Sequence, residues 1–150
     1  MATRQYTTRR QGIVNAIVTK LQQIDGSGAY HTDLNDNISP RLKFWDEVDE
    51  FPAVHINAGG ETREYLTGGV KNRFLTITLR CYVNEEDAVN ALDALLEDVE
   101  TVLEDNANMT YTDKLGVSQG IQQITVLSID TDEGVLEPMG VAEMVAEVRY

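Results

Sequence analysis

The stretch FLTITLRCYVNEEDAVNALDALLEDVETVLED, residues 74–105, decides the fold, because its apolar pattern changes period once. In the first ten residues apolar and polar side chains alternate, which is typical of a strand with one face in a core. That apolar face consists of Leu75, Ile77, Leu79, Cys81 and Val83. From Glu85 to Asp105 the apolar residues recur at steps of three and four, which predicts an amphipathic helix. The stretch therefore predicts a helix packed on a sheet.

The helix over residues 85–105 is predicted to form despite its charge. Asn84 is the expected N-cap, with Asp87 at the third helical position as a variant of the capping box. The segment holds nine acids and no base. Repulsion between like charges four apart costs tenths of a kcal/mol, whereas each buried aliphatic side chain contributes about 1.5 to 3 kcal/mol. The apolar stripe consists of Ala88, Val89, Leu92, Leu95, Leu96, Val99, Val102 and Leu103.

Two further strands are expected after this helix. Residues 106–120 are interpreted as a loop, Ile121 to Ile129 as a strand, and the acid-rich segment from Asp130 to Gly134 as a turn. Gly140 to Tyr150 alternates well and predicts the last strand. Its apolar face consists of Ala142, Met144, Ala146, Val148 and Tyr150.

Before residue 74 the strand signals are shorter. Residues 51–57 (FPAVHIN) predict a strand with Val54 and Ile56 facing inward, ended by Gly59 and Gly60. Residues 59–70 place β-formers between two glycine pairs, so we expect a protruding hairpin or loop. Residues 41–45 (RLKFW) are interpreted as a short edge strand.

The first 24 residues predict a basic arm and helix. From about Thr7 to Ile24 the apolar residues follow a helical stripe, and the segment contains no acid. Arg4, Arg9 and Arg10 lie near the helix start, where the helix dipole disfavours cations. These arginines therefore do not serve helix stability. The arm is either solvated or ordered against an acidic partner, and the sequence leaves both interpretations open.

Together these elements predict a single α+β domain over residues 1–150. Strands joined by turns favour a mainly antiparallel sheet, with the two helices packed on one face. The length suits one domain of ordinary size.

The charge is strongly asymmetric along the chain. There are 25 acids and 12 bases, a net charge of −13. Residues 1–80 hold ten bases and nine acids, whereas residues 81–150 hold two bases and sixteen acids. The net charge opposes non-specific binding to DNA or to an anionic membrane, and no apolar run is long enough to span a bilayer. The asymmetry is either a solvated surface or suited to head-to-tail association between copies.

The sequence shows no recognisable catalytic, cofactor or metal motif, and none is expected. One cysteine, Cys81, cannot form an internal disulfide and is interpreted as a buried, inert thiol. His31 and His55 are too few for a zinc site and have no triad partners at a recognisable spacing. The glycine pairs lack the spacing of a phosphate-binding loop, and the turn at Asp130 fails the calcium-loop pattern.

The acidic face of the second helix has several possible uses. It consists of Asp93, Glu97, Asp98, Glu100 and Glu104. The face is solvated, faces a basic neighbour, or lines a passage through which DNA slides. A catalytic carboxylate pair is the weakest alternative, because no residue of a convergent cleft accompanies it.

Several segments resemble one family, the tail terminator proteins of long-tailed bacteriophages. The family includes the lambda tail terminator and related minor tail and tail completion proteins. The resembling segments are residues 51–56 (FPAVHI), 73–84, 128–134 (SIDTDEG) and 141–150 (VAEMVAEVRY), and the N-terminal helix fits as well. The resemblance spans nearly the whole chain.

The resemblance implies a structural protein with no cofactor. Such proteins form a hexameric ring that caps the tail tube, ends its polymerisation and joins it to the head connector. The implied partners are further copies of the chain, the tube protein, connector or neck proteins, and DNA that passes through the lumen without sequence-specific binding. The implied location is the virion tail or neck, after assembly in the host bacterial cytoplasm.

The candidate contacts follow from the charge pattern and from this resemblance. Subunit or tube contacts are assigned to Arg4, Arg9, Arg10, Glu61, Arg63, Glu64 and Tyr65, the last four by position only. The acidic face is assigned to the lumen or to a subunit interface. Three alternatives remain: another neck or head-tail joining protein, an acidic DNA mimic that inhibits an enzyme, and a small-molecule enzyme. The basic arm opposes the mimic, and the missing site residues oppose the enzyme.

Overall fold

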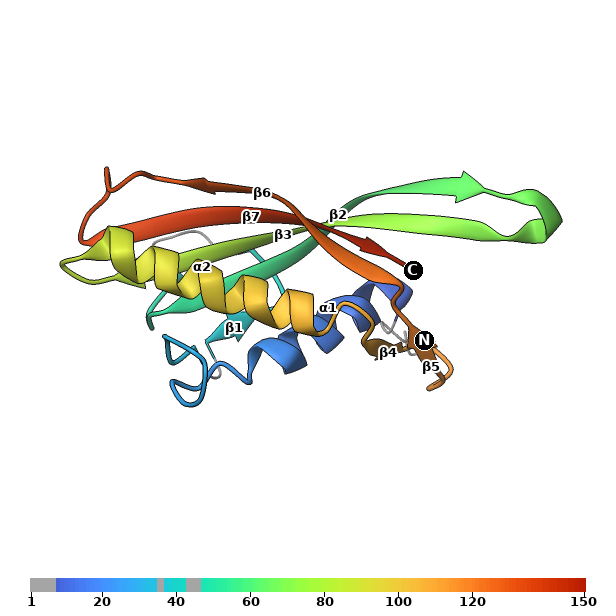
Figure 1. The fold of residues 1–150 in the computed structure, drawn as a ribbon, viewed down its shortest axis with the longest axis horizontal. Coiled ribbons are helices and arrows are strands. Elements are labelled where there is room, and N and C mark those ends of the chain that lie inside the picture. The colour runs from blue at the N-terminus through green and yellow to red at the C-terminus, as the bar shows by residue number, and fades with distance from the viewer. Residues whose placement is uncertain (1–7, 35–36, 43–46) are drawn as a thin grey trace, which may run out of the picture.

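A five-stranded sheet forms the centre of the computed structural model, which describes residues 8–34, 37–42 and 47–150 (Figure 1). The strand order is β1-β2-β3-β7-β6, with β1 parallel to β2 and every other neighbouring pair antiparallel. A separate two-stranded sheet pairs β4 with β5. The strands are β1 (Ile38–Ser39), β2 (Ala53–Tyr65), β3 (Lys71–Asn84), β4 (Thr110–Thr112), β5 (Ser118–Gly120), β6 (Gln123–Thr131) and β7 (Met139–Arg149).

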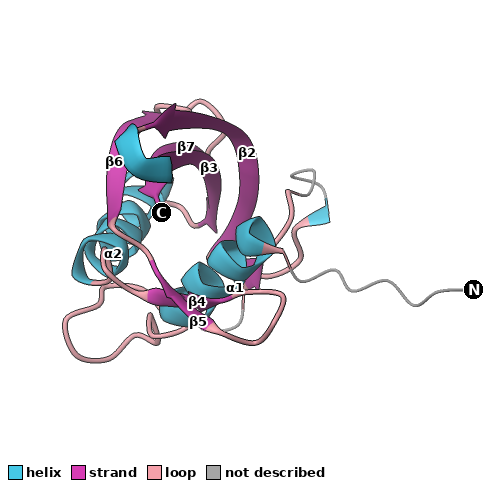
Figure 2. Ribbon diagram, turned by 90° about the vertical axis from the view of Figure 1, so that its right-hand side faces the viewer, coloured by secondary structure: helices cyan, strands magenta, loops and turns pink. Residues whose placement is uncertain are grey.

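Two helices, α1 (Arg9–Leu21) and α2 (Ala88–Asp105), cover one face of this sheet. Figure 2 shows the sheet curved around them. The predicted class, α+β with a mainly antiparallel sheet and helices on one face, is confirmed. Neither helix of the described ranges is long and apolar enough to cross a membrane.

The core lies between the helices and the inner faces of β3 and β7. β3 and β7 bury the apolar faces that the sequence predicts for them. Most residues of their opposite faces are half-buried. Burial of the Cys81 thiol raises its pKa to about 12, so it stays a neutral core side chain at physiological pH. Fully buried core side chains include Ile13, Ile17, Leu21, Ile56, Leu75, Ile77, Leu79, Leu95, Val99, Met144, Ala146 and Val148.

The helix starts show one agreement and one correction. The Thr8 side chain accepts a hydrogen bond from the backbone N–H of Gln11 and caps α1. The predicted cap of α2 is wrong: Asn84 pairs with Met139 as the last residue of β3 and so cannot cap a helix. Asp87 takes the N-cap position, and its carboxylate accepts a hydrogen bond from the Asn90 side chain instead of a backbone N–H.

The glycine pair at 59 and 60 does not end β2, contrary to the prediction. The strand continues to Tyr65, and its pairing with β3 shifts register between Ala58 and Glu61. A bulge of this kind absorbs the glycines without breaking the ladder. The hairpin turns at Thr67–Gly69, where Gly68 and Gly69 have φ of 80° and 78°.

Two short segments also differ from the prediction. The expected strand over residues 41–45 is not found at Arg41 and Leu42, and residues 43–45 lie outside the described ranges. The short edge strand is β1, which pairs with Val54 and His55. The expected loop over residues 106–120 contains the β4–β5 hairpin, which packs against α1. Gly12 permits this contact, because a Cβ there would lie 2.4 Å from the Thr112 carbonyl oxygen.

Candidate functional site

The β2–β3 hairpin extends past the rest of the molecule (Figure 1). The last two residues of the chain, Arg149 and Tyr150, pair with Phe74 and Arg73. From Arg73 to its tip, the hairpin therefore has only two strands. Near its tip Tyr65 is 70% exposed, Leu66 44% and Val70 55%. The Lys71 ammonium lies 5.5 Å from the centre of the Tyr65 ring. The extension therefore presents apolar and aromatic side chains to solvent.

A charged cavity of about 460 Å³ lies at the base of this hairpin, and we call it the basal cavity. It joins the start of α1, both hairpin strands, the β4–β5 turn and the last residue of the chain. Four of the predicted contact residues, Arg9, Arg10, Glu61 and Arg63, lie together here. No local sequence pattern indicated the other lining residues, which are Thr8, Arg73, Asp113, Lys114, Leu115 and Tyr150.

Glu61 is the most constrained side chain of the basal cavity. Its side chain is 7% exposed and accepts hydrogen bonds from the Tyr150 hydroxyl and from Arg63, whose Nε and Nη2 both lie 2.9 Å away. Burial opposes ionisation, but the hydrogen bonds from Tyr150 and Arg63 prevail and hold the pKa of Glu61 below its ordinary value. Burial, together with the bond to Glu61, raises the pKa of Tyr150 to about 12. At neutral pH the pair is a carboxylate and a neutral phenol.

The arginines at the start of α1 have different surroundings. The Arg10 guanidinium donates to the carbonyl oxygens of Ala58, at 3.1 Å, and of Gly59. Arg10 thus ties α1 to the bulge in β2. Arg9 forms no side-chain hydrogen bond or ion pair with the described part of the chain. Arg4 lies outside the described residues.

The two predicted contacts nearest the hairpin tip, Glu64 and Tyr65, lie outside the basal cavity. Both are exposed and lie in the part of β2 that pairs only with β3. They are therefore accessible to a partner that meets the end of the hairpin.

Four of the five residues predicted for the acidic face of α2 are exposed or half-buried. Asp93, Glu97 and Glu104 are exposed and Glu100 is half-buried. Asp98 departs from the expectation, because it is only 2% exposed. Its carboxylate accepts hydrogen bonds from the backbone N–H groups of His31 and Thr32 and from the Thr32 hydroxyl, at 2.6 to 3.0 Å.

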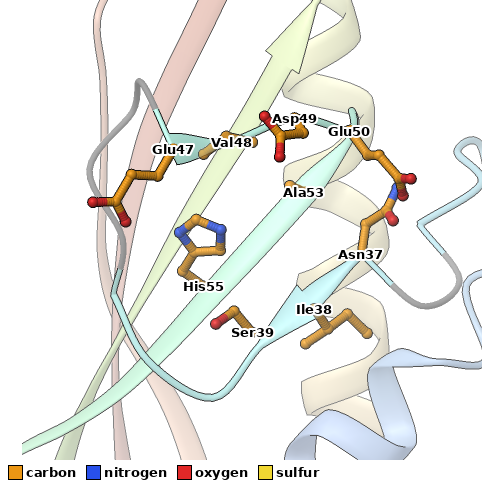
Figure 3. Close-up of a pocket in the computed structure, with 9 residues that line it drawn as sticks. All are labelled: Asn37, Ile38, Ser39, Glu47, Val48, Asp49, Glu50, Ala53 and His55. Carbon is orange, nitrogen blue, oxygen red and sulfur yellow. The ribbon is translucent and has the colours of Figure 1, made fainter.

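A second pocket, of about 260 Å³, lies between β1, β2 and residues 47–50 (Figure 3). His55 lies in it, and its ring centre is 5.0 Å from that of Tyr82. Glu47 and Glu50 point to opposite sides of the pocket (Figure 3). The carboxylates of this pocket are thus spread around its rim and do not meet at one point. Such an arrangement does not favour acid–base catalysis.

Comparison with known proteins decides the family. A family model described as Bacteriophage Tail Tube Terminator Protein matches residues 7–150. The chain belongs to this family. It is 35% identical over 149 residues to the tail tube terminator protein p142 of Escherichia phage T5, covering 94% of this chain and 92% of that protein. The fold is also similar to that of a chain from the virion of a native gene transfer agent particle, with a TM-score of 0.55 at 10% identity, covering 92% and 93% of the two chains.

The family assignment confirms the resemblance found in the sequence. This tail tube terminator is a structural component of the phage virion, and its family is not an enzyme family.

Proposed function

We propose that this terminator forms a ring, of six copies, on the last ring of the tail tube. The ring ends tube polymerisation and joins the tube to the head connector, while DNA passes through its lumen. The role is structural and needs neither catalysis nor a cofactor. The observation that carries the proposal is the two-stranded extension of the β2–β3 hairpin in a chain of the terminator family.

The hairpin extension is suited to docking on another protein. A two-stranded hairpin is marginally stable by itself. Between Arg73 and the tip, neither β6 nor β7 pairs with this hairpin. Its tip exposes Tyr65, Leu66 and Val70. A cluster of exposed apolar and aromatic side chains favours a protein–protein contact, so we assign the tip to the tail tube.

The charge of the chain suits passage of DNA without adhesion. Fixed negative charges repel phosphates only within about one Debye length, roughly 8 to 10 Å at physiological salt. The net charge of −13 makes a ring of these chains negative as a whole, and we assign the acidic residues to the wall that DNA passes. DNA therefore slides past such a ring without forming phosphate contacts.

The proposal is tested by polymerising the tube protein of the same phage in the presence of the terminator. Wild-type protein is expected to stop the growth of tubes, measured as their length distribution by negative-stain electron microscopy. A Tyr65→Ser, Leu66→Ser variant is expected to stay folded and to lose at least tenfold in capping potency, because the tip loses its apolar contacts.

The matched control replaces two exposed apolar residues in a different turn, far from the hairpin in sequence. Val135 and Leu136, in the β6–β7 turn, are 82% and 51% exposed. A Val135→Ser, Leu136→Ser variant is expected to cap tubes as the wild type does. Unchanged tube growth in the presence of folded wild-type terminator would contradict the proposed function, and equal capping by the tip variant would contradict the role of the hairpin.

A further inference from the structure

The basal cavity carries positive charge in an acidic protein. Five cationic side chains line it, against two carboxylates, Glu61 and Asp113. The cations come from α1, β2, β3 and the β4–β5 turn, and they are Arg9, Arg10, Arg63, Arg73 and Lys114. A chain with a net charge of −13 thus gathers nearly half of its 12 bases around one cavity.

Both carboxylates of the basal cavity are already engaged within the subunit. Glu61 is bound by Tyr150 and Arg63. Asp113 accepts hydrogen bonds from the backbone N–H groups of Leu115 and Val117 and from the Gln119 side chain, at 2.9 to 3.1 Å. These bonds hold the β4–β5 turn in shape. The carboxylates therefore leave part of the positive charge unpaired.

Three cations remain for an anion from outside the subunit. Within the described ranges, Arg9, Arg73 and Lys114 form no ion pair with a carboxylate. The Arg73 guanidinium lies 5.5 Å from the centre of the Tyr150 ring, a contact that leaves its N–H groups available. Carboxylates are the matching ligands for such a set.

The α2 helix carries a complementary row, which we call the acidic stripe: Asp93, Glu97, Glu100 and Glu104. The steps of four, three and four place these carboxylates on one line along about 16 Å of helix. The helix contains no Lys or Arg. Oε2 of Glu97 lies 3.3 Å from Nε2 of His31, and the other three carboxylates form no ion pair with described residues.

The two charged surfaces come from different sides of the subunit. Figure 2 shows α2 and β6 on one side and β2, which supplies Glu61 and Arg63 to the basal cavity, on the other. A ring requires a heterologous contact between two different surfaces of each copy. We propose that the basal cavity of one copy binds the acidic stripe of its neighbour. This inference rests on the proposed ring and names its subunit contact.

The contact links ring closure to the hairpin. The basal cavity is built partly from Glu61, Arg63 and Arg73, which form the root of the extension. A neighbour's carboxylates in the cavity therefore fix the direction of the hairpin while its tip meets the tube. Charge pairs of this kind set partner choice and register, and they weaken as salt shortens the Debye length from about 10 Å at 0.1 M to about 3 Å at 1 M.

A charge-swap experiment tests this contact. One variant reverses the cavity (Arg9→Glu, Lys114→Glu), one reverses the stripe (Glu97→Lys, Glu104→Lys), and a third combines all four changes. The readouts are the mass by light scattering after gel filtration and the capping of growing tubes. Each reversed pair alone is expected to weaken assembly at least tenfold, because like charges then face each other. The combined variant is expected to recover assembly, because opposite charges face each other again.

Matched controls separate position from net charge. Glu85→Lys with Glu86→Lys adds the same charge just before α2, at two exposed residues outside the stripe. Arg41→Glu with Gln22→Glu and Gln23→Glu makes the same change in net charge as the cavity variant, at three exposed residues outside both the cavity and the hairpin. Both controls are expected to reach the wild-type mass, and far-UV circular dichroism checks that every variant is folded.

The outcomes distinguish this contact from the proposed function. Wild-type assembly by the single reversals, or a folded combined variant that stays unassembled, would overturn the contact even if wild-type protein caps tubes. If the wild type forms rings only on tubes, the variants are compared by their capping of growing tubes instead of by their mass. Recovery of assembly by the combined variant without any capping by the wild type would support the contact and contradict the terminator function.

Discussion

At the residue scale, Glu61 links the fold of the basal cavity to pH. Its pKa is lower in the folded chain than the ordinary value of 4.5, because Tyr150 and Arg63 bind the carboxylate and outweigh the effect of burial. A group with a lowered folded pKa adds stability above its unfolded pKa and loses that contribution as pH falls through the folded pKa. The stabilisation by Glu61 is therefore complete at neutral pH and declines in acid.

The Glu61→Gln variant tests this linkage. Its melting temperature is expected to lie below that of the wild type at pH 7, and the difference is expected to shrink as pH falls below about 4.5. The measurement is thermal unfolding of both proteins across this pH range. A difference that stays constant down to pH 3 would show that the ionised carboxylate is not the stabilising form.

Asp98 is a structural residue, although the sequence placed it on the acidic face. It lies three residues after Leu95 and four before Val102, so the apolar stripe itself was the signal that it faces inward. Asp98→Ala leaves the N–H groups of His31 and Thr32 without their acceptor. We expect a loss of roughly 2 to 3 kcal/mol in the free energy of unfolding, measured in urea. The exposed Asp93→Ala is the control, with an expected change within about 0.5 kcal/mol.

At the element scale, Gly12 sets how closely the β4–β5 hairpin approaches α1. An alanine Cβ there would lie 2.4 Å from the Thr112 carbonyl oxygen and 3.2 Å from Cδ2 of Tyr111. Gly12→Ala is expected to destabilise the fold by about 1 to 3 kcal/mol despite the higher helix propensity of alanine. Thermal unfolding checks this, with Gly60→Ala as the control because no atom lies within 4 Å of its added Cβ. Equal melting temperatures for the two variants would contradict the close contact.

The elements predicted best from the sequence are those in which buried side chains recur at a regular spacing. β3, β7 and both helices bury one regular set of side chains, so their pattern survives in the sequence. The β4–β5 hairpin lies in a largely polar segment, and its position is set by contact with α1. β2 passes through two glycines because pairing with β3 holds the backbone on both sides of the bulge. Both outcomes depend on tertiary contacts that local pattern does not encode.

The candidate site was predictable only in part, for a similar reason. Charge asymmetry and the position of the hairpin indicated Arg9, Arg10, Glu61 and Arg63, which the basal cavity brings together. Nothing local indicated Lys114 or Tyr150, because their relation to the cavity arises from folding. Tyr150 was predicted only as an inward-facing residue of the last strand, and its hydroxyl reaches a residue 89 positions away.

At the scale of the whole molecule, the fold separates three surfaces. The hairpin tip extends beyond the body (Figure 1). The basal cavity lies at the root of the hairpin, and the acidic stripe lies on α2. Each surface suits a different contact: the tube for the tip, and two different faces of neighbouring copies for the charged pair. This division suits a chain that has ten of its 12 bases in residues 1–80 and 16 of its 25 acids in residues 81–150.

The most direct test of the central claim is cryo-electron microscopy of tube ends after incubation with the wild-type protein. We predict a closed ring of six copies, about 100 kDa for a chain of 16.7 kDa, on the end of each capped tube. The hairpins should point into the last ring of the tube. Tube ends with no bound density, or with single copies that do not touch one another, would contradict that claim.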